Sequence, residues 1–273
     1  DIYRVVSEYV ERKLREDNTN PFARAWLEFG ITRSTTKRSV MCYSYGLSSY
    51  SNRMYINEWY DDEVHGKKRK APFDLDDRYI ATNYLSTLVW QGIETVLHKP
   101  KQCMQWFQDC ARLVADKNRP LKWVTPTGFP VHQEYHNIHH QQVNTWISGK
   151  ATCVKFNVED DRISKMRQKN GVSPNFVHSL DGSCLAQTVV KANQEAGIYD
   201  FSMIHDSYGT HANKIPQLNQ ILRNVFFETF SVDLLRDWKL QLEEQNPDIE
   251  FPEPPEYGNA DVSLVKESAY FFN

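Results

Sequence analysis

Residues 31–46 read ITRSTTKRSVMCYSYG, and this stretch decides more about the chain than any other. Four of its side chains recur every four residues: Arg33, Lys37, Met41 and Tyr45. On a helix over residues 31–46, this spacing places two cations and an aromatic ring along one gently drifting face. Such a face can hold a triphosphate with Arg33 and Lys37, because both cations suit phosphate oxygens. A solvated basic helix with a buried tyrosine is the alternative.

A second informative stretch, residues 200–212, reads DFSMIHDSYGTHA. Its apolar run ends at His205 and Asp206, and Gly209 predicts a turn. Buried strands do not usually end in a histidine and an aspartate side by side. Asp206 is therefore either a metal ligand or a polar strand end, and the local sequence alone favours the strand end.

The composition is that of an ordinary soluble globular protein, with 40% hydrophobic and 25% charged residues. No apolar run approaches the ~20 residues needed to span a membrane, and we find no amino-terminal signal. The net charge of -3 argues mildly against a dedicated DNA-binding domain, but basic residues gather at 33–38 and 67–70 and can form a local phosphate-binding face. Five scattered cysteines without a CxxC pair indicate reduced thiols, not a disulfide frame or a zinc site.

Periodicity and turn residues predict a mostly helical α+β fold. Helices are expected in the first 30 residues, over 31–46, and over 77–116 with a break at Pro100. Two β-hairpins are expected to follow, over 122–135 and over 135–157, the second turning at Ser-Gly-Lys 148–150. The remaining predicted elements are helices at about 159–169, 181–197 and 216–240, a strand at 201–204 and a proline-rich acidic loop at 246–258.

Five motifs carry a resemblance to a known family. The pattern R-x3-K-x7-Y-G at 33–46 resembles the fingers-helix motif of single-polypeptide nucleic-acid polymerases, and TRSTTKRSVM is similar to the bacteriophage single-subunit DNA-dependent RNA polymerases. Four further stretches resemble that family in the same order: WVTPTGFPVHQEY (123–135), PNFVHSLDGS (174–183), IHDSYGT (204–210) and YFFN (270–273). The resemblance therefore covers essentially the whole chain.

The resemblance implies the fingers and carboxyl-terminal palm of a right-hand polymerase, with an inserted specificity hairpin. The implied parts are fingers over 1–134, a promoter-specificity hairpin over 135–160, a return to the fingers over 161–178, and a carboxyl-terminal palm with a terminal foot over 179–273. The implied activity is the transfer of NTPs onto an RNA 3′ end, directed by a DNA template and promoter.

The resemblance also implies roles in nucleotide binding. Arg33 and Lys37 match the pair that binds the triphosphate, where cations neutralise the leaving pyrophosphate. Tyr45 and the adjacent Gly46 match the residues that close the site, and the tyrosine tests for a ribose 2′-hydroxyl. His178 matches a histidine that contacts the same hydroxyl, which can both donate and accept. Without its motif, a single histidine such as His178 is more often a satisfied core residue.

Asp206 matches one of two catalytic aspartates that hold two Mg²⁺ ions, whose preferred ligands are oxygens. His205 is expected to position the site or contact the primer end, not to bind metal. The family's other catalytic aspartate lies upstream of the segment that the opening Asp-Ile-Tyr resembles; Asp1 comes too late to match it, and Asp181 belongs to a later motif. We therefore expect the chain to be inactive alone and to need a second chain or an amino-terminal segment that carries the missing carboxylate.

The hairpin over 135–157 is a candidate DNA reader, because a two-stranded ribbon can enter a major groove. Four side chains are the expected contacts: Gln142, Asn144, Thr152 and Lys155. Three histidines of the same hairpin resemble a metal cluster in composition only, since no cysteine or carboxylate completes a ligand set at suitable spacing: His136, His139 and His140.

Two other functions remain open at this point: a fragment similar to family A DNA polymerases, and a non-catalytic DNA-binding module of the same fold. Related DNA polymerases carry an aromatic residue at the position of Met41, so Met41 and His178 favour RNA synthesis. We expect no membrane partner. The cytoplasm of a bacterial host, for a phage-encoded enzyme, is the expected location, and an organelle is the alternative because Tyr-Phe-Phe-Asn at 270–273 also resembles organellar relatives.

Overall fold

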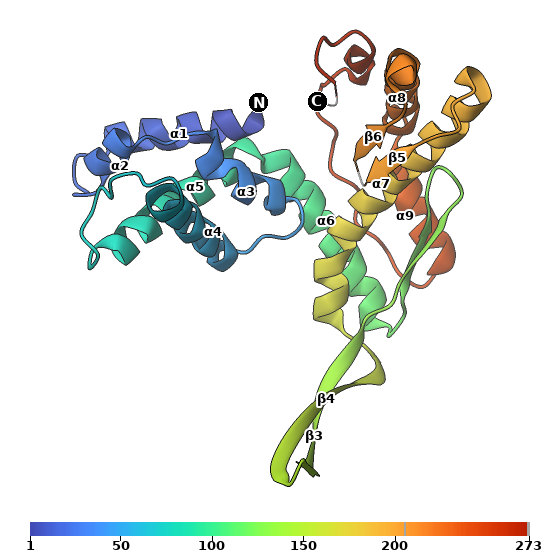
Figure 1. Ribbon diagram of the computed structural model, residues 1–273. Coiled ribbons are helices and arrows are strands. Elements are labelled where there is room, and N and C mark those ends of the chain that lie inside the picture. The colour runs from blue at the N-terminus through green and yellow to red at the C-terminus, as the bar shows by residue number, and fades with distance from the viewer. Residues whose placement is uncertain (205, 272–273) are drawn as a thin grey trace. The chain divides into compact units, whose positions relative to one another are not determined.

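The computed structural model describes residues 1–204 and 206–271. The chain divides into two compact units, Asp1–Gln105 and Trp106–Asn273. Both units are built mainly from helices, and the described strands form three separate two-stranded antiparallel sheets, all in the second unit (Figure 1). The predicted mostly helical α+β class is confirmed. Within the described residues, no helix combines the length and apolar character needed to cross a membrane.

Unit 1 consists of helices that pack around one aromatic core. Its elements are α1 (Ile2–Glu16), α2 (Ala23–Phe29), α3 (Arg33–Tyr43), α4 (Ser49–Asp61), a π-helical turn (Asp62–Gly66) and α5 (Arg78–Val96), followed by the start of α6 (His98–Asp116). Trp26 lies at the centre, fully buried, and its Nε1 donates to the carbonyl oxygen of Ala81 at 3.0 Å. The rings of Phe29, Tyr60 and Phe73 pack edge-on against it.

Two predicted boundaries in unit 1 are wrong. Helix α3 ends at Tyr43 instead of continuing to residue 46, because Gly46 adopts a left-handed φ of +85° and the chain turns there. The N–H of Leu47 then bonds back to the carbonyl of Cys42 at 3.2 Å, which closes the helix end. The break within 77–116 falls at Leu97, and Pro100 lies in the first turn of α6, where its missing N–H is not needed.

Unit 2 contains the rest of α6 and all the strands. Its further elements are β1 (Leu121–Val124), β2 (Pro130–Gln133), β3 (His136–Ile147), β4 (Lys150–Ile163), α7 (Lys165–Ala196), β5 (Ser202–Ile204), β6 (Ser207–Gly209), a 3-10 turn (Ala212–Lys214), α8 (Ile215–Phe230), α9 (Leu234–Gln245) and a second 3-10 turn (Val262–Lys266). Both predicted hairpins are confirmed, as β1–β2 and β3–β4, although the second continues to Ile163.

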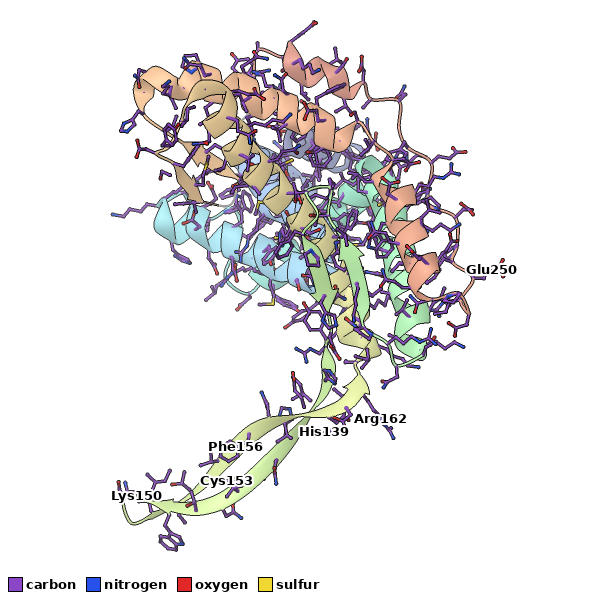
Figure 2. The ribbon with its side chains drawn as sticks, turned by 90° about the vertical axis from the view of Figure 1, so that its right-hand side faces the viewer. His139, Lys150, Cys153, Phe156, Arg162 and Glu250 are labelled. Carbon is purple, nitrogen blue, oxygen red and sulfur yellow. The ribbon has the colours of Figure 1, made fainter. Side chains whose placement is uncertain are left out.

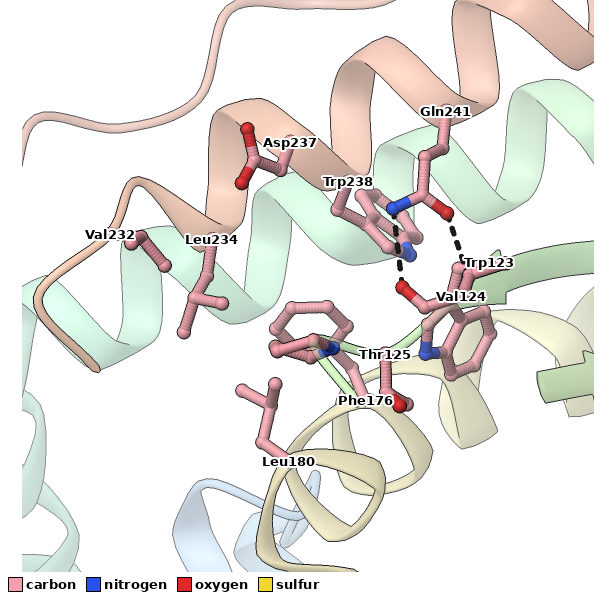
Figure 3. Close-up of a pocket in the computed structure, with 11 residues that line it drawn as sticks. Trp123, Val124, Thr125, Phe176, Leu180, Val232, Leu234, Asp237, Trp238 and Gln241 are labelled. Atoms are coloured by element: carbon pink, nitrogen blue, oxygen red, sulfur yellow. Dashed lines mark hydrogen bonds between the residues drawn. The ribbon is translucent and has the colours of Figure 1, made fainter. Parts of the chain in front are cut away.

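An aromatic cluster joins the helices of unit 2. Trp238 of α9 is almost fully buried, with its ring centroid 4.9 Å from that of Phe107 and 5.9 Å from that of Phe176. Gln241 fixes α9 to β1, since its amide accepts from the Val124 N–H at 2.7 Å and donates to the Val124 carbonyl at 3.2 Å (Figure 3). Trp238, Phe176, Gln241 and Val124 line a pocket of about 210 Å³.

Three expectations for unit 2 need correction. Helices predicted at 159–169 and 181–197 are one helix, α7, which contains Pro174, while residues 159–163 belong to β4. The buried face of α7 continues through the proline at four-residue spacing, and this packing outweighs the lost hydrogen bond: Val172, Phe176, Leu180 and Cys184. The helix predicted at 216–240 is two helices, because Asp233 caps a new one by accepting from the Arg236 N–H at 3.1 Å.

The β3–β4 hairpin extends away from the helices of unit 2 as a long ribbon with Lys150 at its far end (Figures 1 and 2). Ser148 and Gly149 form the two-residue turn, with φ of 51° and 76°. Two positive φ values in a two-residue loop match the twist of a hairpin. The turn predicted at 148–150 is therefore confirmed. Ser148 and Gly149 form it by adopting the two positive φ values.

Candidate nucleotide and nucleic-acid sites

Helix α3 presents its cations to solvent because its opposite face is buried. The buried side consists largely of small hydroxyl residues: Thr35, Thr36 and Ser39, with Val40 and Tyr43 beyond them. Thr32 caps the amino terminus, where its N–H donates to Thr35 Oγ1 at 3.0 Å. Thr36 Oγ1 donates to the Tyr3 carbonyl of α1 at 2.7 Å. These bonds fix the rotation of α3 and leave Arg33 and Lys37 exposed.

The two cations of this face differ in how they are held. Arg33 Nε donates to Asp1 Oδ2 at 2.6 Å, and its guanidinium lies 4.7 Å from the centre of the Tyr3 ring. Lys37 has no ion-pair or hydrogen-bond partner among the described residues. Arg33 is therefore pre-oriented by the start of α1, whereas the Lys37 ammonium is available to an anion.

Arg38, next to Lys37, has a different environment. It pairs with Glu58 of α4, and its guanidinium stacks 3.9 Å from the centre of the Tyr55 ring. The charge of Arg38 is therefore neutralised within unit 1, although the sequence places it beside Lys37.

Met41 and Tyr45 complete the predicted series in part. Met41 lies on the exposed side of α3, with 46% of its surface accessible. Tyr45 lies in the turn after the helix, 38% exposed, and is followed by Gly46. Of the four side chains predicted to share one helical face, Arg33, Lys37 and Met41 lie on the helix. Tyr45 lies in the turn beyond its end.

Asp206 lies at the end of the short β5–β6 hairpin and is exposed. The strands pair Ser202 with Gly209 and Ile204 with Ser207, so the chain reverses direction between Ile204 and Ser207. The turn predicted at Gly209 is therefore wrong: Gly209 lies within β6, where an added Cβ would come 3.0 Å from the Ser202 carbonyl oxygen. His205, predicted beside Asp206, lies outside the described residues, as do the last two residues of the terminal aromatic motif.

Helix α7 and the β5–β6 hairpin bring three titratable side chains near one another. Partial burial is the largest influence on the Asp181 carboxyl and raises its pKa. The nearby His178 lowers that pKa, and the nearby Asp206 raises it. Burial also raises the pKa of Tyr208 to about 12, with smaller contributions from Cys184, Asp181 and Asp206. The structure thus places the predicted His178 and Asp206 close to Asp181, to which sequence reasoning gave no role.

The described residues offer a partial fit to a divalent cation. Asp206 provides exposed carboxylate oxygens, which suit Mg²⁺, and it borders a pocket of about 260 Å³ between the hairpin and α8. In the part of the chain that the structure describes, no three His, Cys, Asp or Glu side chains gather as a metal site. Asp206 can therefore supply one protein ligand, and further ligands must come from other groups.

The β3–β4 hairpin has two chemically different faces. Cross-strand pairing places Gln142 opposite Lys155 and Asn144 opposite Cys153, all on one face. His140 and Asn157 continue that face, joined by a 2.9 Å contact from Nδ1 to Oδ1. The opposite face is mixed: it carries the apolar Val143, Ile147, Val154, Phe156 and Val158, together with His139, Gln141, Lys150 and the pair of Thr145 and Thr152. Three of the four predicted DNA contacts therefore share a face, and Thr152 lies on the other.

The hairpin histidines pair with residues of the hairpin and its approach. His136 contacts the Asp160 carbonyl at 2.7 Å and Glu134 at 3.2 Å, and His139 contacts the Asp160 carboxylate at 2.7 Å. His139 also lowers the pKa of Asp160 through that contact. Their ring nitrogens thus fix the two strands to one another at the base of the ribbon.

Comparisons with known proteins identify the family. A family model described as DNA-dependent RNA polymerase matches residues 1–248. The chain belongs to this family. It is 32% identical to T7 RNA polymerase of Escherichia phage T7 over 93% of this chain and 31% of that protein. It is also 32% identical to the mitochondrial DNA-directed RNA polymerase 1 of Nicotiana sylvestris, over 89% of this chain and 23% of that protein.

Another relative is covered more fully by this chain. DNA-directed RNA polymerase 2A of Nicotiana tabacum is 32% identical, over 89% of this chain and 70% of that protein. The chain spans about a quarter of the length of the mitochondrial relative. The relatives include phage and plant-organelle polymerases, so an organellar origin fits the comparisons as well as the predicted phage origin.

Proposed function

We propose that this chain is the carboxyl-terminal catalytic part of a DNA-directed RNA polymerase. In this proposal it transfers nucleotidyl groups from NTPs onto the 3′ end of an RNA copied from a DNA template. The observation that carries the proposal is the exposed cation pair of α3, Arg33 and Lys37, in a chain that belongs to the DNA-dependent RNA polymerase family. Residues 1–134 and 161–178 are assigned to the fingers and residues 179–273 to the palm and foot.

The α3 cations are assigned to the triphosphate of the incoming nucleotide. Lys37 contributes a point charge without a competing carboxylate among the described residues. Arg33 contributes a planar fork that already points along the start of α1 through its bond to Asp1. Because negative charge develops on the leaving pyrophosphate, fixed cations stabilise the transition state more than the ground state.

Tyr45 and His178 are assigned to the ribose of the same nucleotide. A 2′-hydroxyl donates and accepts, so a phenol and an imidazole can both partner it. Tyr45 is presented by the turn at Gly46, and His178 by an exposed position of α7. A deoxyribonucleotide would leave both groups without that partner, which gives the preference for ribose a physical basis.

Asp206 is assigned to metal binding. Mg²⁺, when bound, would activate the RNA 3′-hydroxyl and neutralise the leaving pyrophosphate. Asp206 would hold it through exposed carboxylate oxygens at the turn of the β5–β6 hairpin. The second catalytic aspartate is assigned to another segment or chain, and this chain together with that segment is called the assembled polymerase below. Templated RNA synthesis by the isolated 273-residue chain would contradict this assignment.

The polar face of the β3–β4 hairpin is assigned to the promoter. Gln142 and Asn144 present amides on one side of an exposed ribbon, and amides pair bidentately with adenine in the major groove. Lys155, opposite Gln142, would contact phosphate. Thr152 lies on the opposite face of the hairpin, so of the four residues it is the least supported as a DNA contact.

A comparison of the adjacent cations Lys37 and Arg38 of α3 tests the proposed function. We expect Lys37→Gln in the assembled polymerase to lower kcat/KM for NTPs by about 10²–10³-fold, because a charge at the leaving group is lost. Arg38→Gln is the matched control: it removes the same charge one residue away, but from a side chain paired with Glu58 and stacked on Tyr55. Equal losses in both variants, or no loss in Lys37→Gln, would contradict the proposal.

A further inference from the structure

The direction of the β3–β4 hairpin is set where the ribbon leaves the helices of unit 2. Most residues of its two strands are exposed, and the ribbon extends away from those helices (Figure 2). At about 3.3 Å per residue, the 12-residue strand β3 reaches about 35 Å. A rotation of about 5° at its base would move Gln142 and Asn144 by about 2 Å, enough to break a hydrogen bond. The contacts at the base therefore determine where the polar face lies.

A buried network of side-chain amides joins the strand before the hairpin to the first turns of α7. Gln133, at the end of β2, donates through Nε2 to the carbonyl of Gln168 at 2.9 Å and to its Oε1 at 2.8 Å. Gln168 Nε2 donates in return to the Gln133 carbonyl at 2.9 Å. Gln168 is fully buried and Gln133 almost so. Buried amides are costly unless paired, and their bonds are directional, so this network holds β2 and α7 in one relative orientation.

Tyr135, the residue directly before β3, packs on the same helix. Asn175 Nδ2 donates to the Tyr135 hydroxyl oxygen at 2.9 Å and to Gln133 Oε1 at 2.8 Å. The Tyr135 ring lies on Gly171, where an added Cβ would come 2.6 Å from Cε2 of that ring. The Arg167 guanidinium lies 5.2 Å from the ring centre. Because Arg167, Gly171 and Asn175 recur every four residues, they share one face of α7, called the Tyr135-binding stripe below.

Main-chain contacts hold both strands of the ribbon at the start of α7. The N–H of Ser164, the N-cap residue of α7, donates to the Tyr135 carbonyl at 2.7 Å. Arg167 Nη1 donates to the His136 carbonyl, at the first residue of β3, at 2.9 Å. Strand β4 ends at Ile163 and continues directly into Ser164. The base of the ribbon is therefore attached to α7 from both strands.

A different part of α7 supplies most of its apolar burial. Phe176 is buried in the aromatic cluster, with its ring centroid 4.7 Å from that of Phe107. The Tyr135-binding stripe is half-buried to exposed, and its contacts run to the base of the hairpin. A change in the stripe should therefore alter the direction of the hairpin more than it alters the folding of unit 2.

We propose that the Tyr135-binding stripe of α7 orients the β3–β4 hairpin for promoter reading, with Asn175 as the positioning residue that links Tyr135 to the buried amides. This inference rests on the proposed function, which assigns the polar face of the hairpin to the promoter. Asn175 does not touch DNA in this scheme. It fixes the place at which Gln142 and Asn144 meet the base edges, so promoter choice depends on α7 as well as on the reading face.

Two reactions of the assembled polymerase separate orientation from folding. The first is initiation on a duplex that the parent polymerase selects from a random-sequence DNA pool, and the second is extension of an RNA primer annealed to a single-stranded DNA template. We expect Asn175→Ala to raise KM for the selected duplex by about 10-fold, the effect of displacing a base contact, with kcat and primer extension unchanged. Asn170→Ala is the matched control, because it makes the same substitution at an exposed position of the same helix and should leave both reactions unchanged.

Gly171→Ala tests the same stripe by adding an atom instead of removing a hydrogen bond. Alanine is favoured over glycine inside a helix, but here its methyl group must displace the Tyr135 ring. We therefore expect KM for the selected duplex to rise by about 10-fold here as well, with primer extension kept.

Gln142→Ala tests the promoter role on which this inference rests. If the parent selects no duplex, or if Gln142→Ala uses the selected duplex as well as the parent does, the promoter assignment fails and the orienting role fails with it. If Gln142→Ala loses promoter use while Asn175→Ala and Gly171→Ala keep it, the promoter assignment stands and the orienting role alone is overturned. Equal losses of promoter use and primer extension in Asn175→Ala and Gly171→Ala would also overturn it, since these residues would then support the fold as a whole.

Discussion

Helices α3 and α7 both present polar side chains at the surface, yet their buried faces differ. The buried face of α3 is made largely of hydroxyl residues, and Thr36 bonds to the Tyr3 carbonyl at 2.7 Å. The middle of α7 is buried through an apolar series that includes Phe176. Hydrogen bonds are directional and contribute about 1 kcal/mol each, whereas burying a large apolar side chain contributes more. The comparison indicates that the buried face of α3 mainly sets the rotation of that helix about its axis. The buried face of α7 mainly contributes to the free energy of unfolding.

The largest expected effect on stability is in α7. Phe176→Ala should lower the free energy of unfolding by about 3–5 kcal/mol, since it removes a buried aromatic ring from a packed cluster. The Phe176 centroid lies 4.7 Å from that of Phe107 and 5.9 Å from that of Trp238. Urea unfolding of the chain measures the change. A loss below 1 kcal/mol would show that the apolar face does not hold α7 in place.

A smaller effect, on the choice between NTP and dNTP, is expected at the turn that follows α3. Tyr45→Phe should lower the preference for NTP over dNTP by about 2- to 10-fold, because a single hydroxyl partner of the ribose is removed. Incorporation of each nucleotide by the assembled polymerase measures it, with overall NTP incorporation largely kept. Unchanged discrimination would remove Tyr45 from sugar selection and leave that task to His178.

The smallest expected effect is on the buried face of α3. Thr36→Val should lower the free energy of unfolding by about 1 kcal/mol, because it deletes one hydrogen bond and keeps the shape of the side chain. One helical turn further along, Ser39→Ala should not lower the free energy of unfolding. Ser39 is fully buried and its hydroxyl has no partner among the described atoms, so its removal should leave stability unchanged or raise it. Equal losses in both variants would contradict a hydrogen-bonded role for Thr36.

The sequence predicts features that are encoded locally. The exposed cations of α3 follow from four-residue spacing, and the hairpin turn at Ser148 and Gly149 follows from turn chemistry. The mistaken helix end at residue 46 had a local signal as well, because Gly46 is the residue that adopts a positive φ and ends the helix.

Features that depend on tertiary packing were not predictable in the same way. Pro174 suggests a helix boundary, but the buried series on either side of it keeps α7 continuous. The break between α8 and α9 depends on Asp233 as a cap, in a stretch where apolar periodicity is otherwise helical. The nearness of Asp181 to Asp206 arises because the β5–β6 hairpin folds back beside α7, which no spacing in the sequence records.

The most direct test of the central claim is templated RNA synthesis by the assembled polymerase with Asp206→Asn. Asp200→Asn is the matched control, because Asp200 is an exposed acid near the same hairpin whose partner is His211. We expect Asp206→Asn to lower the synthesis rate by about 10³-fold, in line with the several kcal/mol that metal-ion catalysis supplies, and Asp200→Asn to retain the parent rate. Synthesis at the parent rate by Asp206→Asn would contradict the account, since this chain would then lack the catalytic carboxylate that it is proposed to supply.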